Sequence, residues 1–204
     1  MNILIIGGGG REHSVARSIS ISKNCNKIYI LPGNAGTAEV GENIEGDVND
    51  FNLIKKTVLS NQISVVFVGP EDPIVNGIYD FFKKEQSLKD ILIVAPGKRA
   101  AKLEGSKDFA KVFMKKNNIP TAKYSTFSKE TIQQAYSFLD QMKPPYVLKA
   151  DGLAAGKGVL ILNNLYEAKK ELDNMLLKSK FGKASNRVVI EEFLDGIELS
   201  CFVL

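Results

Sequence analysis

The chain begins MNILIIGGGGREH (residues 1–13), where an apolar run over 3–6 leads directly into four glycines. A helical pattern of apolar residues follows from about Arg11. This order predicts a buried strand, a tight turn and a helix, because glycine tolerates the backbone angles that such turns require. The stretch therefore indicates the first unit of a parallel α/β sheet.

Three further β-branched runs, at 27–31, 65–68 and 91–95, each lead into Gly or Pro. The segments 49–61 and 73–84 between them carry apolar residues at helical spacing. Parallel strands that alternate with crossover helices produce this pattern. We therefore predict a sheet whose faces are covered by these helices.

The pattern changes after Pro96, and we place a domain boundary near residue 100. Ser106 and Ser128 are each predicted to cap a helix, because a serine oxygen can accept from the first backbone N–H groups. The side chains expected to face inward are Phe109, Val112 and Phe113 on the first helix, and Ile132, Ala135 and Leu139 on the second.

Two strands joined by a flexible glycine-rich loop are predicted over 146–164, followed by a helix at 165–177 and a strand at 187–191. The last residues, ELSCFVL (198–204), are predicted as an apolar strand. A strand that stopped there would leave its neighbour unpaired. We therefore expect the chain to be the front part of a longer protein.

Composition excludes several classes of protein. The 204 residues are 44% apolar and 25% charged, as in ordinary globular domains. The net charge of +4 is too small to predict binding to nucleic acid or to a membrane surface. No apolar stretch approaches the roughly 20 residues of a membrane span. Cys25 and Cys201 lie far apart and the first strand leaves no room for a secretory leader, so we expect a cytosolic protein.

The four glycines indicate an anion site more strongly than a redox dinucleotide site. The third glycine of G-x-G-x-x-G is replaced by Glu12 or His13, depending on where the pattern starts. The second strand ends in LPGNAGT (31–37), where an acid that binds ribose is expected. A helix N-terminus still favours a phosphate or carboxylate, and Arg11 can add a planar fork of donors.

The turns at 32–37 and 69–73 are expected at the same edge of the sheet, so that Glu12 and Glu71 project towards one crevice. An acid beside a phosphate site suggests recognition of hydroxyls or an amine. The alternative is that Glu12 and Asp72 only cap helices. His13, the single histidine, is either a hydrogen-bonded structural group or a base.

A second glycine-rich segment, KADGLAAGKGV (149–159), does not have P-loop spacing. We interpret it as a flap whose backbone amides could wrap a polyphosphate, with Lys149 at the strand end beside an α-phosphate. Lys107, a cation in a first helical turn, opposes the helix dipole and is a second candidate. The alternative for both lysines is a solvated surface position.

The stretch VVIEEFLDGIELS (188–200) places Glu191 and Glu192 on opposite faces at the end of an apolar strand. A carboxylate that accepts from an exocyclic amine, with a backbone N–H near Leu194, is the chemistry of adenine recognition. Glu198 could then accept from ribose hydroxyls. The alternative is a strand edge protected by charge.

Seven motifs along the chain carry a family resemblance: GGGGREH (7–13), PGNAGT (32–37), GPEDPIVNG (69–77), LEGSKDFAK (103–111), IPTAKY (119–124), LKADGLAAGKGV (148–159) and VIEEFLDGIELS (189–200). In this order they resemble the phosphoribosylamine–glycine ligase family of ATP-grasp enzymes. The resemblance implies an α/β fold: a Rossmann-like parallel-sheet domain over 1–102, then an incomplete ATP-grasp domain over 103–204, with a smaller nucleotide-covering subdomain at 123–190.

The resemblance also implies a reaction. ATP phosphorylates the carboxylate of glycine, and the amine of phosphoribosylamine captures the acyl phosphate, by positioning and charge neutralisation rather than by a protein nucleophile. Alternatives are another ATP-grasp carboxylase or carboxylate–amine ligase, or a non-catalytic ATP-binding module. The expected partners are these small molecules, without nucleic acid or membrane.

No residue of this chain is assigned as a catalytic nucleophile or base, and Lys107 and Lys149 are expected to position ATP. The Mg²⁺ or Mn²⁺ ligands are expected after residue 204, so the fragment alone is expected to be inactive. The ATP residues implied by the resemblance are Lys107, Lys149, Gly152, Ala154, Ala155, Gly156, Lys157, Gly158, Glu191, Glu192, Phe193, Leu194 and Glu198. Those implied for phosphoribosylamine are Gly9, Gly10, Arg11, Glu12, Asn34, Ala35, Gly36, Thr37, Gly69, Pro70 and Glu71.

Overall fold

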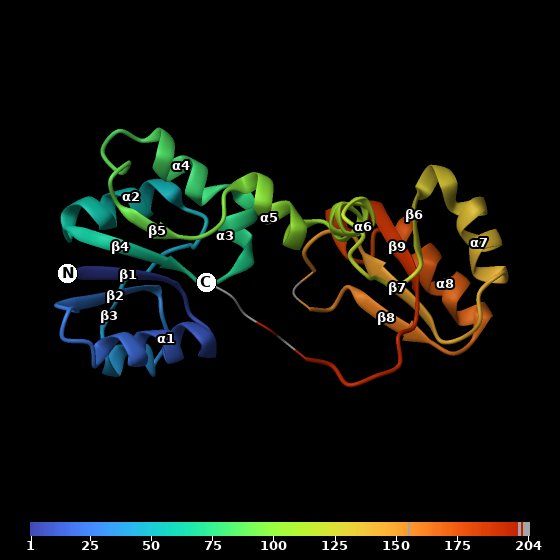
Figure 1. The fold of residues 1–204 in the computed structure, drawn as a ribbon, viewed down its shortest axis with the longest axis horizontal. Helices are drawn as coiled ribbons and strands as arrows, with labels where there is room; N and C mark the ends of the chain where they lie inside the picture. Colours follow the sequence, from blue (N-terminus) through green and yellow to red (C-terminus); the bar gives the residue numbers. More distant parts are fainter. Residues whose placement is uncertain (155, 200, 202–204) are drawn as a thin grey trace. The chain divides into compact units, whose positions relative to one another are not determined.

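The computed structural model describes residues 1–154, 156–199 and 201 (Figure 1). Contacts between Cα atoms divide the chain into two compact units, Met1–Glu104 and Gly105–Leu204. Each unit has its own sheet, and each is described by itself.

The first unit is built on a parallel sheet of five strands in the order β3-β2-β1-β4-β5. The strands are β1 (Asn2–Gly7), β2 (Lys27–Pro32), β3 (Glu42–Asn43), β4 (Ile63–Val68) and β5 (Leu92–Val94). The runs predicted from the sequence correspond to four of these strands. The two-residue strand β3 has no β-branched run to mark it and was not predicted.

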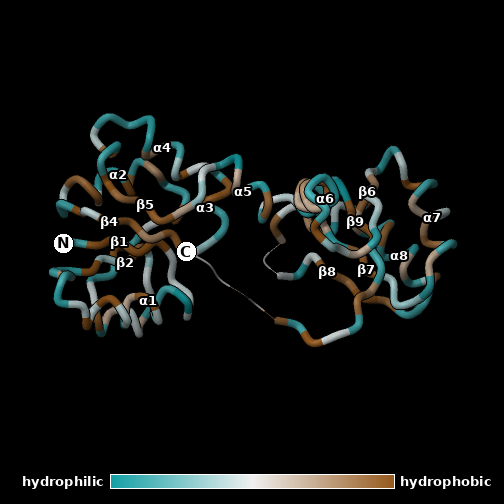
Figure 2. The backbone as a smooth tube through the Cα atoms, viewed as in Figure 1, coloured by the Kyte–Doolittle hydropathy of each residue, from teal (hydrophilic) through white to brown (hydrophobic). Residues whose placement is uncertain are grey.

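Helices cover both faces of this sheet, as Figure 1 shows for α1 on one side and α2 and α4 on the other. Ala16 of α1 packs with Ile3 and Ile5, whereas Ile54 of α2 packs with Leu4 on the other face. The helices are α1 (Gly10–Ser20), α2 (Phe51–Ser60), α3 (Glu71–Asn76) and α4 (Ile78–Lys84), with a short 3-10 helix η1 (Thr37–Glu39). The apolar strands lie inside these layers (Figure 2).

The single helix predicted over 73–84 is wrong. Gly77 has a left-handed φ of 97° and ends α3 before α4 begins. Glycine adopts this conformation without the steric cost that a side chain would add. A further helix, α5 (Lys98–Gly105), was not predicted from the sequence and reaches the division between the two units.

The second unit contains an antiparallel sheet of four strands in the order β6-β9-β7-β8. The strands are β6 (Tyr124–Ser128), β7 (Tyr146–Ala150), β8 (Val159–Leu162) and β9 (Arg187–Glu192). Strands β7, β8 and β9 match the prediction. Strand β6 was missed because its sequence, YSTFS, is largely polar.

The other elements of this unit are α6 (Lys107–Lys116), η2 (Lys129–Thr131), α7 (Ile132–Asp140), α8 (Leu165–Leu176) and η3 (Gly182–Asn186). Helices α7 and α8 cover one face of the sheet, where Ala135, Leu139 and Leu172 are fully buried. Ser106 caps α6 as predicted, and its hydroxyl accepts from the backbone N–H of Phe109 at 3.1 Å.

Two expectations for this unit are wrong. On α6, Val112 and Phe113 are 51% and 40% exposed, and Lys111 is the buried residue instead. The described residues of the predicted last strand, Glu198, Leu199 and Cys201, are not in a strand. A strand is held by hydrogen bonds to a neighbour, and none pairs with these three residues. The remaining residues of that prediction lie outside the described part of the chain.

Across the described residues, no helix combines the length and apolar character that a membrane span needs.

Candidate functional site

The face of the second sheet that α7 and α8 leave open carries the predicted nucleotide residues. Lys149 lies opposite Val159 and Val189, and Val147 lies opposite Ile161 and Glu191. Directly opposed residues share a face of an antiparallel sheet. Val159 and Ile161 are 42% and 55% exposed, so an uncovered apolar strip borders the charged pair Lys149 and Glu191.

Glu191 is the buried centre of this face. It is only 4% exposed, and its two carboxylate oxygens face different lysines. Lys149 Nζ contacts Oε1, and Lys111 Nζ lies 2.5 Å from Oε2. Oε2 is fully buried, and the Lys111 ammonium group is its charged partner. Lys149 is the more exposed of the two partners, so Oε1 is the oxygen from which a ligand N–H group could take over when Lys149 moves.

Lys111 was not predicted as part of the site. Its ammonium group also donates to Thr121 Oγ1 at 2.8 Å and lies 5.5 Å from the centre of the Tyr124 ring. Burial, with a smaller contribution from the charge of Asp108, raises the pKa of Tyr124 above its ordinary value. The sequence signal that could have identified Lys111 is its spacing from Lys107, because residues one helical turn apart share a helix face.

The start of α6 is tied to the glycine-rich segment through Asp151. Its Oδ1 accepts from Ser106 Oγ at 3.0 Å and from the backbone N–H of Asp108 at 2.8 Å. Lys107 Nζ donates to the carbonyl of Gly152 at 3.2 Å. The structure therefore places Lys107 beside the segment that the sequence predicted as a phosphate flap.

The glycine-rich segment connects β7 and β8 as a hairpin loop. Ala150 N donates to Gly158 O at 2.8 Å, and Lys157 N donates to Ala154 O at 2.9 Å. A Cβ on Gly158 would lie 2.8 Å from the Ala154 side chain, which explains the glycine there. Ala155, also predicted at the site, lies outside the described residues.

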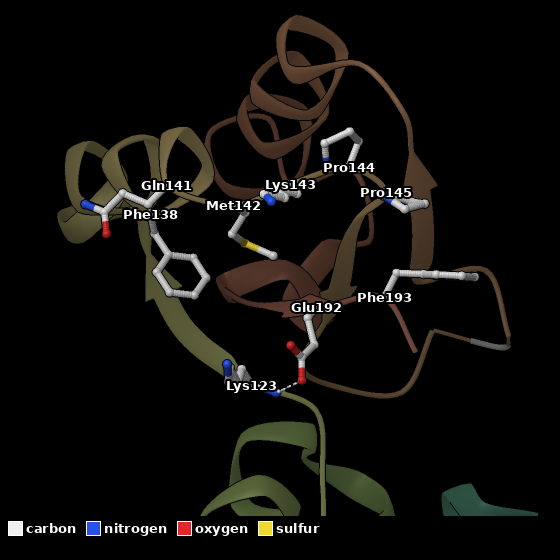
Figure 3. A pocket seen from close by; sticks show the side chains of 9 residues that line it. All are labelled: Lys123, Phe138, Gln141, Met142, Lys143, Pro144, Pro145, Glu192 and Phe193. Carbon is white, nitrogen blue, oxygen red and sulfur yellow. Dashed lines mark hydrogen bonds between the residues drawn. The ribbon is translucent and has the colours of Figure 1, made fainter. Parts of the chain in front are cut away.

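Glu192 faces away from Lys149 and Glu191. Its Oε1 accepts from the backbone N–H of Lys123 at 2.9 Å. Figure 3 shows it in a cavity of about 490 Å³ with Phe138 and Met142. The other lining residues are Lys123, Gln141, Lys143, Pro144, Pro145 and Phe193. The predicted residues Phe193, Leu194 and Glu198 are exposed and follow β9 without regular structure.

A second set of predicted residues meets at the carboxyl ends of β1, β2 and β4, around Glu12. Glu12 is 5% exposed, and its Oε2 accepts from the backbone N–H of Gly9 at 2.7 Å. A Cβ on Gly7 would lie 2.6 Å from Glu12 Cγ, and one on Gly69 would lie 2.1 Å from Oε1. These glycines make room for the carboxylate. Because Gly9 is the N-cap residue of α1, the bond from its N–H means that Glu12 caps the helix, as the alternative interpretation predicted.

Asn34 joins the first two turns of this set. Its Nδ2 donates to Gly8 O at 3.0 Å, and its Oδ1 accepts from the backbone N–H of Thr37 at 3.0 Å. A Cβ on Gly36 would lie 2.4 Å from the His13 ring, so the histidine packs against this turn. The structure thus brings together the turns that carry Gly9, Gly10 and Asn34 to Thr37.

The acidic and basic residues at the rim of these turns differ in exposure. The side chain of Arg11 is 62% exposed, and its Nε lies 3.8 Å from Glu12 Oε1. Glu71 and Asp72 lie in the first turn of α3, which has no side-chain cap. Asp72 therefore does not cap the helix, contrary to one of the interpretations of the sequence.

Comparison with known sequences accounts for both units. The N domain of phosphoribosylglycinamide synthetase matches residues 1–104, and its ATP-grasp (A) domain matches residues 105–204. The chain belongs to the phosphoribosylglycinamide synthetase family. Phosphoribosylamine–glycine ligase of Haemophilus influenzae is 46% identical over 206 positions, covering all of this chain and 47% of the relative. The Caldanaerobacter subterraneus enzyme of the same name is 43% identical over 202 positions, covering 99% and 47%.

Two solved structures, one of them from the family, share the fold of this chain. The Thermotoga maritima phosphoribosylamine–glycine ligase superposes with a TM-score of 0.73 at 31% identity, covering 97% of this chain and 45% of that one. The biotin carboxylase domain of Hydrogenobacter thermophilus 2-oxoglutarate carboxylase also gives 0.73, at 17% identity, covering 95% and 44%. The chain spans about half the length of the curated relatives it matches.

Proposed function

We propose that the whole protein joins glycine to 5-phosphoribosylamine with ATP, giving glycinamide ribonucleotide, ADP and phosphate in purine biosynthesis. The observation that carries the proposal is the buried Glu191 between Lys111 and Lys149, on a partly uncovered sheet face at the start of the glycine-rich segment. Family membership supports the same conclusion.

In this proposal the purine of ATP lies on the apolar strip formed by Val159 and Ile161. Glu191 accepts from the exocyclic amine, and the backbone near Phe193 and Leu194 completes the adenine contacts. Glu192 contributes through its backbone, because its side chain lies on the other face. Glu198 holds the ribose.

The triphosphate lies between Lys149, at the start of the glycine-rich segment, and Lys107, whose Nζ donates to Gly152 O within that segment. Lys149 leaves Glu191 Oε1 to contact it, and Lys107 reaches it from the start of α6. The backbone of Gly152 to Ala154 and of Gly156 to Gly158, including Lys157, closes over the phosphates, and the predicted role of Ala155 falls outside the described residues. Cations beside the phosphates neutralise the charge that develops during phosphoryl transfer.

Phosphoribosylamine is assigned to the turns of the first unit. The start of α1, with Gly9, Gly10 and Arg11, favours its phosphate. Residues Asn34 to Thr37 and Gly69 to Glu71 form the rest of the site. Glu12 shapes this site from within, since its carboxylate is engaged with Gly9 N.

The reaction then requires two displacements. A carboxylate oxygen of glycine attacks the γ-phosphorus, and ADP leaves. The amine of phosphoribosylamine attacks the carbonyl carbon of glycyl phosphate, and phosphate leaves as the amine loses a proton. The protein's part is orientation and charge neutralisation, so no protein nucleophile is needed.

A divalent metal ion would neutralise the phosphates further, but this part of the chain does not fit one. Among the described residues, no three His, Cys, Asp or Glu side chains lie close enough to hold an ion. We therefore derive no step through a metal. The sequence-based expectation that Mg²⁺ or Mn²⁺ ligands follow residue 204 stays a prediction. We also propose a cytosolic location, because phosphorylated substrates do not cross membranes unaided.

The test is product formation by the whole protein from glycine, phosphoribosylamine and ATP. ADP release that requires both glycine and phosphoribosylamine supports the proposal. Release that depends on bicarbonate would identify a carboxylase, and ATP binding without turnover would identify a non-catalytic module. Replacing Lys149 with Met should weaken ATP binding by roughly 10- to 150-fold, as expected for the loss of a charged hydrogen bond.

A further inference from the structure

We infer that Lys111 is a positioning residue for nucleotide selection: it fixes the carboxylate of Glu191 towards the 6-amino group of adenine and balances its charge when Lys149 turns to the phosphates. The inference rests on the proposed function and deepens it.

The two lysines differ in their freedom to move. The Lys149 side chain is 29% exposed and extends from the end of β7, whereas the Lys111 side chain is 11% exposed. Lys111 is also held by Thr121 Oγ1 and by the face of the Tyr124 ring. Lys149 is therefore the partner that can leave Glu191, and Lys111 is the partner that stays.

Charge balance explains why a second lysine is needed. If Lys149 left and no other cation remained, Glu191 would be a buried anion near a triphosphate. An unpaired buried charge is strongly unfavourable, and the phosphates would add repulsion. The other charged groups at this end of α6, Asp108, Asp151 and Arg187, form their own network. Lys111 is thus the cation that keeps Glu191 compensated with nucleotide bound.

A fixed, ionised Glu191 also selects the base. A carboxylate can only accept hydrogen bonds. The amino group at position 6 of adenine donates, whereas the oxygen at position 6 of guanine accepts and would be repelled. When Lys149 turns to the phosphates, Oε1 loses its partner and can accept from the ligand, while Lys111 stays 2.5 Å from Oε2 and fixes the carboxylate. A buried polar group that only one base can satisfy gives strong discrimination.

The experiment measures dissociation constants of ATP and GTP for the whole protein by calorimetry. The variants are Lys111→Met, Lys111→Arg and, as a matched control, Lys116→Met at an exposed position of the same helix. We expect Lys111→Met to weaken ATP binding at least about tenfold and GTP binding less than about twofold, so that selectivity falls. Lys111→Arg should restore most of the selectivity, and Lys116→Met should match the unsubstituted protein.

In steady-state assays the same loss should raise KM for ATP with little change in kcat, because Lys111 does not touch the reacting atoms. Unchanged ATP to GTP selectivity in a folded Lys111→Met protein would overturn the inference. An equal loss of both nucleotides, which indicates a purely structural role, would overturn it as well.

If Lys111→Met does not fold, the substitution is tested in the Glu191→Gln protein instead. Adding Lys111→Met to Glu191→Gln should change selectivity no further than Glu191→Gln alone, because Lys111 acts through Glu191. A further tenfold change in that background would contradict the inference. If the unsubstituted protein fails to bind ATP, the proposed function itself is wrong, which is distinguishable from a failure confined to Lys111.

Discussion

Two buried glutamates, one in each unit, are stabilised in different ways. Glu12 is 5% exposed and Glu191 is 4% exposed. Glu12 accepts from a backbone N–H of its own glycine turn, and three glycines leave space for its side chain. Glu191 is surrounded by the ammonium groups of Lys111 and Lys149.

The difference separates a structural role for Glu12 from a ligand-binding role for Glu191. The hydrogen-bond donor to Glu12 is backbone, which cannot leave without unfolding the turn, and the exposed Arg11 adds only a 3.8 Å ionic contact. The partners of Glu191 are flexible side chains, and a ligand with a donor and a polyphosphate can rearrange them. A buried acid is therefore a better candidate for recognition when its partners can move.

The largest expected effect on stability comes from neutralising each of the two acids. Glu191→Gln leaves two lysines without their carboxylate, and breaking a buried ion pair should cost about 3 kcal/mol of unfolding free energy. Glu12→Gln can still accept from Gly9 N and should cost about 1 kcal/mol. Hydrogen exchange of amides in each unit measures the two effects separately. Equal losses would show that the partners do not matter.

The glycine space around Glu12 can be tested with alanine. Gly7→Ala combines a φ of 124° with a Cβ placed 2.6 Å from Glu12 Cγ, and should cost about 2–4 kcal/mol through strain and overpacking. Gly10→Ala is the control, since nothing lies within 4 Å of its Cβ. It should be neutral or stabilise by up to about 1 kcal/mol. Urea unfolding of the first unit measures both, and a destabilised Gly10→Ala would contradict the assignment.

Asp151 allows a third test, because it caps α6 in the second unit as Glu12 caps α1 in the first. Asp151→Ala removes acceptors for Ser106 Oγ and Asp108 N and should cost about 1.5 kcal/mol. It should also weaken ATP binding, since Lys107 is positioned by the same contacts. Asp72→Ala, at the uncapped start of α3, is the control and should change stability by less than about 0.5 kcal/mol. Amide exchange in α6 and in α3 reports the two effects.

The smallest expected effect concerns pH. The pKa of Tyr124 is raised, chiefly by burial and further by Asp108. A raised folded-state pKa gives a contribution that is complete below the unfolded value near 10 and is lost as pH rises through the folded value. Relative to Tyr124→Phe, the unsubstituted protein should therefore lose less than about 1 kcal/mol above pH 10. Thermal unfolding at pH 8 and pH 11 measures this, and a constant difference between the two proteins would refute it.

The sequence predicted most of the first unit because its signals are local. Strand β1, the glycine turn and α1 follow from residues 1–13 alone, since β-branched runs, glycines and helical spacing act within a few residues. The break at Gly77 was missed although the glycine was visible, because its positive φ depends on how α3 and α4 pack. In the second unit the cap at Ser106 was predicted and is present.

Prediction failed where distant segments meet. The apolar residues of α6 predicted a buried stripe of Phe109, Val112 and Phe113. The spacing of Lys107 and Lys111 shows only that they share a helix face and does not indicate that Lys111 is buried. Lys111 is inside because β9, far along the chain, places Glu191 beneath it. Strand β6 is likewise polar and forms because β9 offers it a paired edge.

The sequence by itself determined the order of the elements, the tight turns and the kinds of chemistry available, because these depend on backbone preferences and side-chain type over short distances. Only the tertiary structure decided which charged groups are buried together. Burial and pairing of charges are properties of segments brought together by folding, and an isolated stretch of sequence carries no record of its partner.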